Sequence, residues 1–151
     1  MKYIREAKSK AECIFCKACS TTEDEKNFVL LRGNHAFAML NTYPYNNGHL
    51  MIAPYAHLST LEEASPEVLL EMIQIAQKSL RSLREVYNPD GFNLGFNLGR
   101  TAGAGIEEHF HLHIVPRWDG DTNFMSVLAN VRVMPEDIRE TYIKLSQHLQ
   151  K

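Results

Sequence analysis

Three of the chain's seven histidines occupy every second position of one short segment, HFHLHIVPRW at 109–118. His109, His111 and His113 alternate with apolar residues, and a period of two is typical of a β-strand. Successive side chains of a strand point to opposite faces, so the three imidazoles are expected on one face and the apolar side chains on the other. The pattern predicts a strand that packs its apolar face against a core and presents a row of histidines.

A histidine-rich surface strand is the simpler interpretation, but strict alternation beside a glycine-rich loop argues against chance placement. A zinc site formed by all three imidazoles is also disfavoured, because positions i, i+2 and i+4 of a flat strand seldom converge on one ion. Neighbouring rings ~7 Å apart are close enough for one small ligand to touch several of them. The segment is therefore the first candidate for a binding or catalytic site.

Short apolar runs separated by turn residues predict the other strands. FVLLR at 28–32 and AFAML at 36–40 flank a Gly-Asn pair, which favours a hairpin, and HLMIAP at 49–54 follows as a third strand. GFNLGFNLG at 91–99 predicts a fourth strand, and NFMSVLANVRVM at 123–134 has a strand-like composition. We expect a five- to six-stranded, mainly antiparallel sheet.

Apolar residues recur at every third or fourth position of 66–87, which predicts one long amphipathic helix. Ser65-Pro66 is a typical N-terminal cap for this helix, and 60–63 favours a short helix just before it. A C-terminal helix is predicted to begin at 135–136. Together with the sheet, these helices predict an α+β fold in a single domain over 1–151.

The composition is that of an ordinary folded domain, with 44% apolar and 23% charged residues and a formal net charge of -2. No Lys and Arg cluster is long enough to follow a phosphate backbone, so polymeric DNA or RNA is not an expected partner, whereas a small anionic ligand is compatible. No apolar run approaches the ~20 residues of a membrane span, and the N-terminus does not resemble a signal peptide. We expect no membrane partner and a cytoplasmic location.

All three cysteines, Cys13, Cys16 and Cys19, lie in CIFCKAC within the N-terminal stretch 1–26. Three cysteines in so short a segment make a poor disulfide framework. In a reducing compartment, a Cys-x-x-Cys pair favours metal binding or redox chemistry. Two buried thiols that pack as small apolar side chains are the alternative. A lone pair supplies only two of the four ligands of a structural zinc, so this segment alone does not define a site.

The pattern His-φ-His-φ-His-φ-φ at 109–115, with φ apolar, resembles the motif of the histidine triad (HIT) superfamily of nucleotide hydrolases and transferases. The likeness covers most of the chain and includes three further features: Asn41 eight residues before His49, Pro54-x-x-His57, and Asn97-Leu98-Gly99 before the glycine-rich loop. PRWDGDTNFM at 116–125 resembles the branch related to diadenosine tetraphosphate phosphorylases.

This resemblance implies a covalent mechanism. His111 is expected to attack the α-phosphorus of a nucleotide derivative and form a nucleotidyl-histidine, which water or another acceptor then resolves. Neutral imidazole is a good nucleophile near pH 7 and a good leaving group when protonated. His113 is expected to bond phosphate oxygens and manage protons, and His109 completes the triad or, where a metal is bound, helps to position the strand.

The substrate contacts are also implied by the resemblance. Asn41 is expected to bind the ribose hydroxyls, His49 to lie near the nucleotide, and Asn97 to contact the phosphate or the nucleophile's strand. Backbone N–H groups of the glycine-rich loop are expected to bind the phosphate, at Gly103, Ala104 and Gly105. The structural alternatives are a turn residue for Asn41, a capping residue for His49, a strand-edge residue for Asn97 and an ordinary loop for the glycine-rich segment.

Zinc-containing members of the superfamily use a Cys-x-x-Cys pair, a histidine after the third strand and the first histidine of the triad. Here those positions are Cys13, Cys16, His57 and His109, so the resemblance implies a structural Zn²⁺. The alternatives are that His57 is a solvated loop residue, and that Cys19 supplies a third thiolate in its place.

Gly105 and Ile106 stand where the better-known branches carry Gln followed by Ser or Thr, so two side-chain donors are missing. An open glycine loop can admit inorganic phosphate as the acceptor, which favours cleavage of dinucleoside polyphosphates such as diadenosine tetraphosphate. The alternatives are an adenosine phosphoramidate hydrolase, a zinc-dependent hydrolase and a non-catalytic nucleotide-binding module. Trp118 is expected to stack on a base or to pack in the core or an interface, and the resemblance implies a homodimer.

Overall fold

Five antiparallel strands form one sheet in the order β1-β2-β3-β5-β4, in a computed structural model that describes residues 13–122 and 136–150. The strands are β1 (Val29–Arg32), β2 (Ala36–Leu40), β3 (Leu50–Pro54), β4 (Gly91–Phe96) and β5 (Leu112–Arg117). The predicted antiparallel sheet is confirmed, although β4 ends before the expected residue 99. The candidate strand at 123–134 lies outside the described residues.

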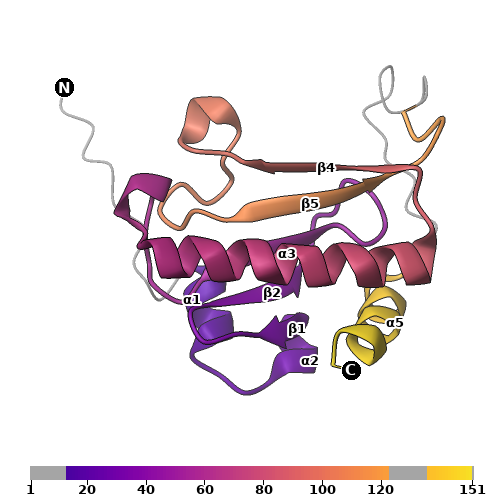
Figure 1. Cartoon of the computed structure of the whole chain (residues 1–151), viewed down its shortest axis with the longest axis horizontal. Coiled ribbons are helices and arrows are strands. Elements are labelled where there is room, and N and C mark those ends of the chain that lie inside the picture. Colours follow the sequence, from indigo (N-terminus) through magenta and orange to yellow (C-terminus); the bar gives the residue numbers. More distant parts are fainter. Residues whose placement is uncertain (1–12, 123–135, 151) are drawn as a thin grey trace.

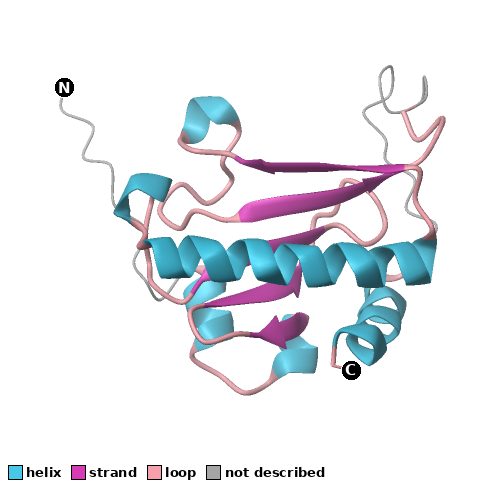
Figure 2. Ribbon diagram, viewed as in Figure 1, coloured by secondary structure: helices cyan, strands magenta, loops and turns pink. Residues whose placement is uncertain are grey.

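Helix α3 (Pro66–Tyr87) crosses one face of the sheet, and α5 (Ile138–Leu149) packs beside it (Figure 1). The bounds of α3 agree with the prediction, and Ser65 Oγ accepts a hydrogen bond from the backbone N–H of Val68 at 3.5 Å. The C-terminal helix is confirmed, with Asp137 as its N-cap residue. The α+β class predicted from the sequence is therefore the observed one, as the helices and strands of Figure 2 show.

Short helical segments connect these elements. They are α1 (Ile14–Cys19), α2 (Asp24–Asn27) and the 3-10 turns η1 (Leu61–Glu63) and η2 (Arg100–Ala102). The short helix expected at 60–63 is the η1 turn, and the Thr60 side chain does not cap it. Within the described ranges, no helix has both the length and the apolar character needed to cross a membrane.

Two hydrophobic clusters cover the two faces of the sheet. The larger one includes residues of α3 and α5 and takes in Phe110, Leu112 and Ile114. The smaller one lies on the α1 side and includes Phe15 and Met39. Because both faces are covered, every residue of β2 and β3 is buried, which explains the continuous apolar sequence of these two strands.

The histidine segment keeps its predicted alternation but forms a shorter and more deeply buried strand than expected. β5 begins at Leu112, so His109 and His111 precede the paired residues, and the backbone N–H of Phe110 donates to the carbonyl of Leu58 at 2.7 Å. The face that carries the histidines is covered near α1, and His109 and His111 are 0% and 5% exposed. The expected open row of imidazoles is therefore a partly enclosed site.

Strand β3 determines which other histidines reach this segment. It runs antiparallel to β5, with Met51 opposite His113. His49 precedes β3 and His57 follows it. The two ends of β3 therefore bring one additional histidine each to opposite ends of the histidine segment.

Glu71 of α3 holds the turn between β1 and β2. Its carboxylate accepts hydrogen bonds from the backbone N–H groups of Asn34 at 2.8 Å, His35 at 2.5 Å and Ala36 at 2.7 Å. Burial acts to raise the pKa of Glu71, but the three N–H donors together outweigh it and lower the pKa. The charged form of Glu71 therefore stabilises the folded state.

Glu71→Gln is expected to reduce the free energy of unfolding by on the order of 1–2 kcal/mol at pH 7, because a neutral amide accepts these bonds more weakly. The folded-state pKa lies below the unfolded one, so this stabilisation is present above the unfolded pKa and is lost as the pH falls through the folded pKa. Urea unfolding at pH 7 and at about pH 3 measures the effect. Glu140→Gln, on the exposed side of α5, is the control, and a difference that persists unchanged in acid contradicts the interpretation.

Candidate active site and metal centre

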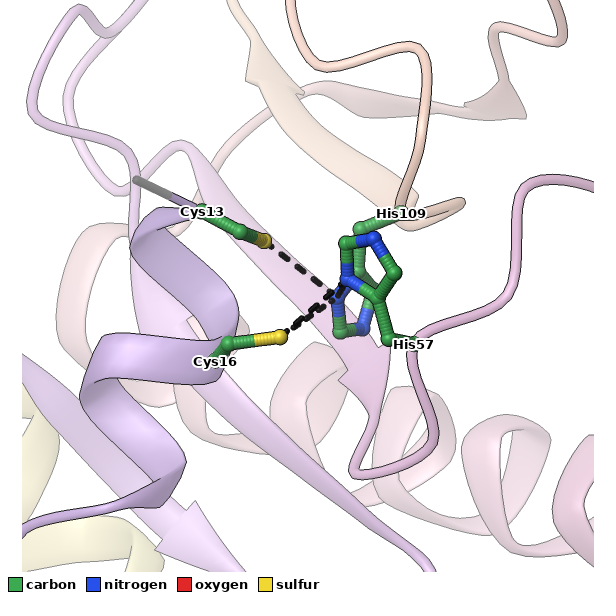
Figure 3. A group of neighbouring side chains, drawn as sticks. All are labelled: Cys13, Cys16, His57 and His109. Carbon is green, nitrogen blue, oxygen red and sulfur yellow. Dashed lines mark hydrogen bonds between the residues drawn. The ribbon is translucent and has the colours of Figure 1, made fainter. Parts of the chain in front are cut away.

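Four side chains from three distant parts of the chain meet beside α1. Cys13 is the N-cap residue of α1 and Cys16 lies within it, while His57 follows β3 and His109 precedes β5. One ligand atom from each lies within 4.8 Å of the others, and Figure 3 shows both thiols directed at the two rings. The fold thus assembles the four residues that the resemblance implied.

Four of the six distances between the ligand atoms of this cluster are close to those around one tetrahedral ion. Cys16 Sγ lies 3.2 Å from His57 Nδ1 and 3.6 Å from His109 Nδ1. Cys13 Sγ lies 3.4 Å from His109 Nδ1, and the two Nδ1 atoms are 3.2 Å apart. Zinc with bonds of about 2.3 Å to sulfur and about 2.0–2.1 Å to nitrogen holds its ligand atoms about 3.3–3.8 Å apart. The remaining pairs lie within 4.8 Å, so the cluster has the donor set of a Cys₂His₂ zinc site and needs small side-chain shifts to reach its size.

The ring of His109 is oriented for such a role. Its Nε2–H donates to the carbonyl of Pro54 at 2.8 Å, so the lone pair is on Nδ1, which points into the cluster. Burial lowers the pKa of His109 to about 4, which keeps the ring neutral near pH 7. Cys19 lies outside the group found among the described residues, and burial and the neighbouring Cys16 raise the pKa of its thiol to about 11. The geometry favours His57 over Cys19 as the fourth ligand.

His111 is held in one tautomer next to this cluster. Its Nδ1–H donates to the backbone carbonyl of His109 at 2.9 Å, which leaves the lone pair on Nε2. Burial lowers the pKa of His111 and so favours the neutral ring. The ring of Phe15, from α1, packs with its centre 4.7 Å from that of His111 and 5.0 Å from that of His109. Nε2 of His111 therefore has the protonation state and the support that a nucleophile needs.

His113 and His49 form a second hydrogen-bonded pair. The backbone N–H of Tyr45 donates to His49 Nδ1 at 3.0 Å, so the proton of His49 is on Nε2, which lies 2.9 Å from His113 Nδ1. His113 accepts this bond and carries its own proton on Nε2. Burial, with His111 nearby, lowers the pKa of His113 to about 4. The ring centres of His111 and His113 are 4.7 Å apart, so the Nε2–H of His113 lies beside the ring of His111.

The family assignment follows from these motifs and from comparison with known proteins. A family model described as the HIT domain matches residues 22–120. The chain belongs to the HIT family. Cys13 and Cys16 lie just before the matched residues, whereas the histidine segment lies within them.

Relatives of this HIT domain include an enzyme and proteins of known structure. It is 44% identical over 118 residues to the AP-4-A phosphorylase of Mycobacterium tuberculosis, a match that spans 78% of this chain and 60% of the phosphorylase. A zinc-bound histidine triad family protein from Mycobacterium smegmatis superposes with a TM-score of 0.73 at 27% identity, covering 94% of this chain and 96% of that one. A hypothetical histidine triad nucleotide-binding protein from Sulfolobus tokodaii gives 0.70 at 26% identity, covering 91% and 89%.

Asn41 lies next to the His49 pair of this HIT domain. Its Nδ2 is 3.4 and 3.5 Å from the ring nitrogens of His49, and its Oδ1 accepts a hydrogen bond from the backbone N–H of Tyr43 at 2.9 Å. Asn41 therefore lies beside the hydrogen-bonded rings of His49 and His113 and also fixes the start of the following loop. Its role toward a ribose stays a prediction.

The glycine-rich loop of the HIT domain is partly bonded to itself. The backbone N–H of Gly103 donates to the carbonyl of Arg100 at 3.0 Å, and that of Ala104 donates to the carbonyl of Gly99 at 3.3 Å. Asn97 lies beneath the loop, since a Cβ on Gly103 would be 3.8 Å from Asn97 Nδ2, while the space around Gly105 is open. Phosphate binding by these three loop residues stays a prediction, and Gly105 is the most open of them.

Arg117 and Trp118 make structural contacts after the triad. Arg117 donates to both carboxylate oxygens of Asp121, at 2.6 and 2.8 Å, and to Asn93 Oδ1 at 2.7 Å. The ring of Trp118 packs edge-on against Tyr87 of α3, with centres 6.4 Å apart. Arg117 therefore forms a partly exposed ion pair, and the contact with Tyr87 favours the interpretation of Trp118 as a packing residue.

Phe15 and Tyr45 are two residues of this site that sequence reasoning did not identify. Phe15 supports the ring of His111, and the backbone of Tyr45 fixes the tautomer of His49. The position of Phe15 between Cys13 and Cys16 was a usable signal, because a large apolar residue between two candidate ligands is expected to be buried near them. Tyr45 gave no comparable signal, since it lies in a loop of turn-forming residues.

Proposed function

We propose that this HIT domain transfers a nucleotidyl group from a dinucleoside polyphosphate, such as diadenosine tetraphosphate, to His111 and from there to phosphate or water. The observation that carries the proposal is the tautomer of His111, whose Nδ1–H is bonded to the backbone and whose Nε2 holds the lone pair. A neutral imidazole held in this way is an activated nucleophile at neutral pH.

The proposed reaction has two balanced steps. In the first, His111 Nε2 bonds to the α-phosphorus, the bond to the bridging oxygen breaks, and ATP leaves from diadenosine tetraphosphate. His113 Nε2–H is placed to donate a hydrogen bond to the departing oxygen, which leaves as a phosphate anion and needs no proton. In the second, phosphate attacks the adenylyl-histidine and gives ADP, or water attacks and gives AMP, and His111 is restored.

The similarity to the AP-4-A phosphorylase supports phosphate as the acceptor. Because the match spans only 60% of that protein, the activity is carried to this chain as a proposal. Hydrolysis of adenosine phosphoramidates is the second candidate, because the Nε2–H of His113 can bond the nitrogen of an amine leaving group as well as an oxygen.

Product analysis tests the proposal. With diadenosine tetraphosphate and excess phosphate the full chain is expected to release ADP and ATP, and without phosphate AMP and ATP at a lower rate. An adenosine phosphoramidate is compared under the same conditions. Background rates with both substrates contradict the enzymatic proposals and favour the nucleotide-binding module.

We propose further that Cys13, Cys16, His57 and His109 hold a structural Zn²⁺. The distances within the cluster and the bond from His109 to Pro54 support this, and one solved relative is a zinc-bound histidine triad family protein. The ion would hold α1 and the His57 loop against the start of the histidine segment. His109 then serves as a ligand and not as an acid or base.

The homodimer and the cytoplasmic location stay predictions. Leu94, 46% exposed on the edge strand β4, supports an interface there, because an exposed apolar side chain on a sheet edge favours pairing with a second copy. The absence of a disulfide among the described cysteines supports a reducing compartment. A small-molecule nucleotide is the proposed ligand.

A further inference from the structure

The loop between β2 and β3 carries two tyrosines at the rim of the candidate site. Tyr43 is 85% exposed and Tyr45 is 47% exposed. Neither the nucleotide contacts nor the metal centre described above uses either phenol ring. Large apolar rings held in water next to a candidate active site are typical of a binding surface.

Tyr45 places this loop beside His113, the hydrogen-bond donor to the leaving group in the proposed reaction. Its ring centre lies 6.3 Å from that of His113, with an angle of 23° between the ring planes, and 4.8 Å from that of His49. His113 is the ring that we assign to the departing oxygen. Tyr45 therefore lies next to the ring that contacts the leaving group, and Tyr43 lies two residues before it in the same loop.

Contacts at both ends of the loop hold this surface in place. Tyr43 is fixed by the bond from its backbone N–H to Asn41 Oδ1. Asn46 Nδ2 donates to the carbonyl of Pro116 at 3.0 Å and to Asp121 Oδ2 at 2.8 Å. Gly48 has a φ of +75°, and a Cβ there would lie 2.9 Å from Leu83. A loop anchored in this way loses little freedom on binding, which favours affinity.

We propose that Tyr43 and Tyr45 form the subsite for the second nucleoside of a dinucleoside polyphosphate, the one that leaves with the departing phosphates. The base of this nucleoside stacks on the exposed ring of Tyr43, while the phosphate chain passes Tyr45 and His113. Stacking on an aromatic ring suits any base, so this subsite selects for the presence of a second nucleoside and only weakly for its identity. The assignment rests on the proposed function.

The test compares two substrates that share the AMP half and differ in the leaving group, diadenosine tetraphosphate and the p-nitrophenyl ester of AMP. Tyr43→Leu is expected to lower the ratio of kcat/KM for the dinucleotide to that for the ester by about tenfold, the effect of one lost base stack. Tyr43→Phe keeps the ring and is expected to keep the ratio. Ile143→Ala, at an exposed apolar residue of α5, is the matched surface control.

Binding measured by calorimetry makes the test independent of turnover. The affinity for a methylene-bridged, non-hydrolysable dinucleoside tetraphosphate is compared with that for AMP, and Tyr43→Leu is expected to weaken the former about tenfold more than the latter. A ratio that stays within about twofold of wild type, or an equal loss for both ligands, overturns the subsite. So does a change of oligomeric mass in Tyr43→Leu by light scattering, which assigns Tyr43 to an interface. Failure of wild type to turn over either substrate counts against the proposed function alone, because the binding ratio still decides on the subsite.

Discussion

Replacing His111 by alanine is expected to lower kcat/KM for diadenosine tetraphosphate by at least about 10⁴-fold, because the nitrogen that bonds the α-phosphorus is removed. His111 is singled out by its backbone-bonded Nδ1–H and by a ring that is 5% exposed and supported by Phe15. Wild-type protein quenched with an alkaline denaturant shortly after mixing should gain about 330 Da, the mass of one adenylyl group, because the P–N bond of the adduct is stable in base and labile in acid. Intact mass spectrometry should show no such gain in the alanine variant.

His113→Asn is the matched control, because it keeps the nucleophile and removes the imidazole N–H that bonds the leaving group. This variant should still form the adduct from the p-nitrophenyl ester of AMP, whose leaving group is stable as an anion, and should be slowed most on a phosphoramidate, whose poorer leaving group depends more on that hydrogen bond. An adduct mapped to another residue, or a His111→Ala variant with full turnover, contradicts the covalent mechanism. A similar loss on both substrates in His113→Asn contradicts the role given to His113.

The parts of the fold that could be predicted are those with local signals. The bounds of α3 were predictable because apolar residues at helical spacing and the Ser65-Pro66 cap lie within one segment. β2 matched its predicted range for the same reason, since a short apolar run between turn residues determines both its ends. The length of β5 was not predictable, because the backbone of Phe110 bonds to Leu58, which lies 52 positions earlier in the sequence.

The candidate site shows the same division. The alternation of the triad correctly predicts which face each histidine occupies, but the cover that α1 gives to that face depends on contacts such as Cys13 with His109, 96 residues apart. A capping role was a reasonable interpretation of His49 from sequence. Its place beside His113 follows only from the register that sets Met51 opposite His113, because His49 then lies on the same face two residues away. Sequence periodicity predicts the sheet face of each histidine, whereas the strand register is needed to predict its neighbour on the adjacent strand.

Zinc analysis is expected to decide whether His57 or Cys19 is the fourth ligand of the proposed zinc site. Purified wild-type protein should contain about one zinc per chain, and Cys16→Ser and His57→Ala should each lose most of it, since each removes one of four ligands. Cys19→Ser is the matched control and should retain the metal, because Cys19 lies outside the cluster. Mass spectrometry of the native protein and elemental analysis measure the content.

Loss of the ion should also destabilise the fold and the nucleophile together. Two of the proposed ligands lie on or beside α1, which holds Phe15 against His111. A third is His109, whose backbone carbonyl accepts the hydrogen bond from His111 Nδ1–H. Cys16→Ser is therefore expected to lower Tm by on the order of 10 °C and to slow adduct formation. Because thiolates and neutral imidazoles are the binding forms, zinc content should fall as the pH is lowered. A zinc-free wild type with full stability contradicts the metal centre, and zinc loss in Cys19→Ser but not in His57→Ala reassigns its fourth ligand.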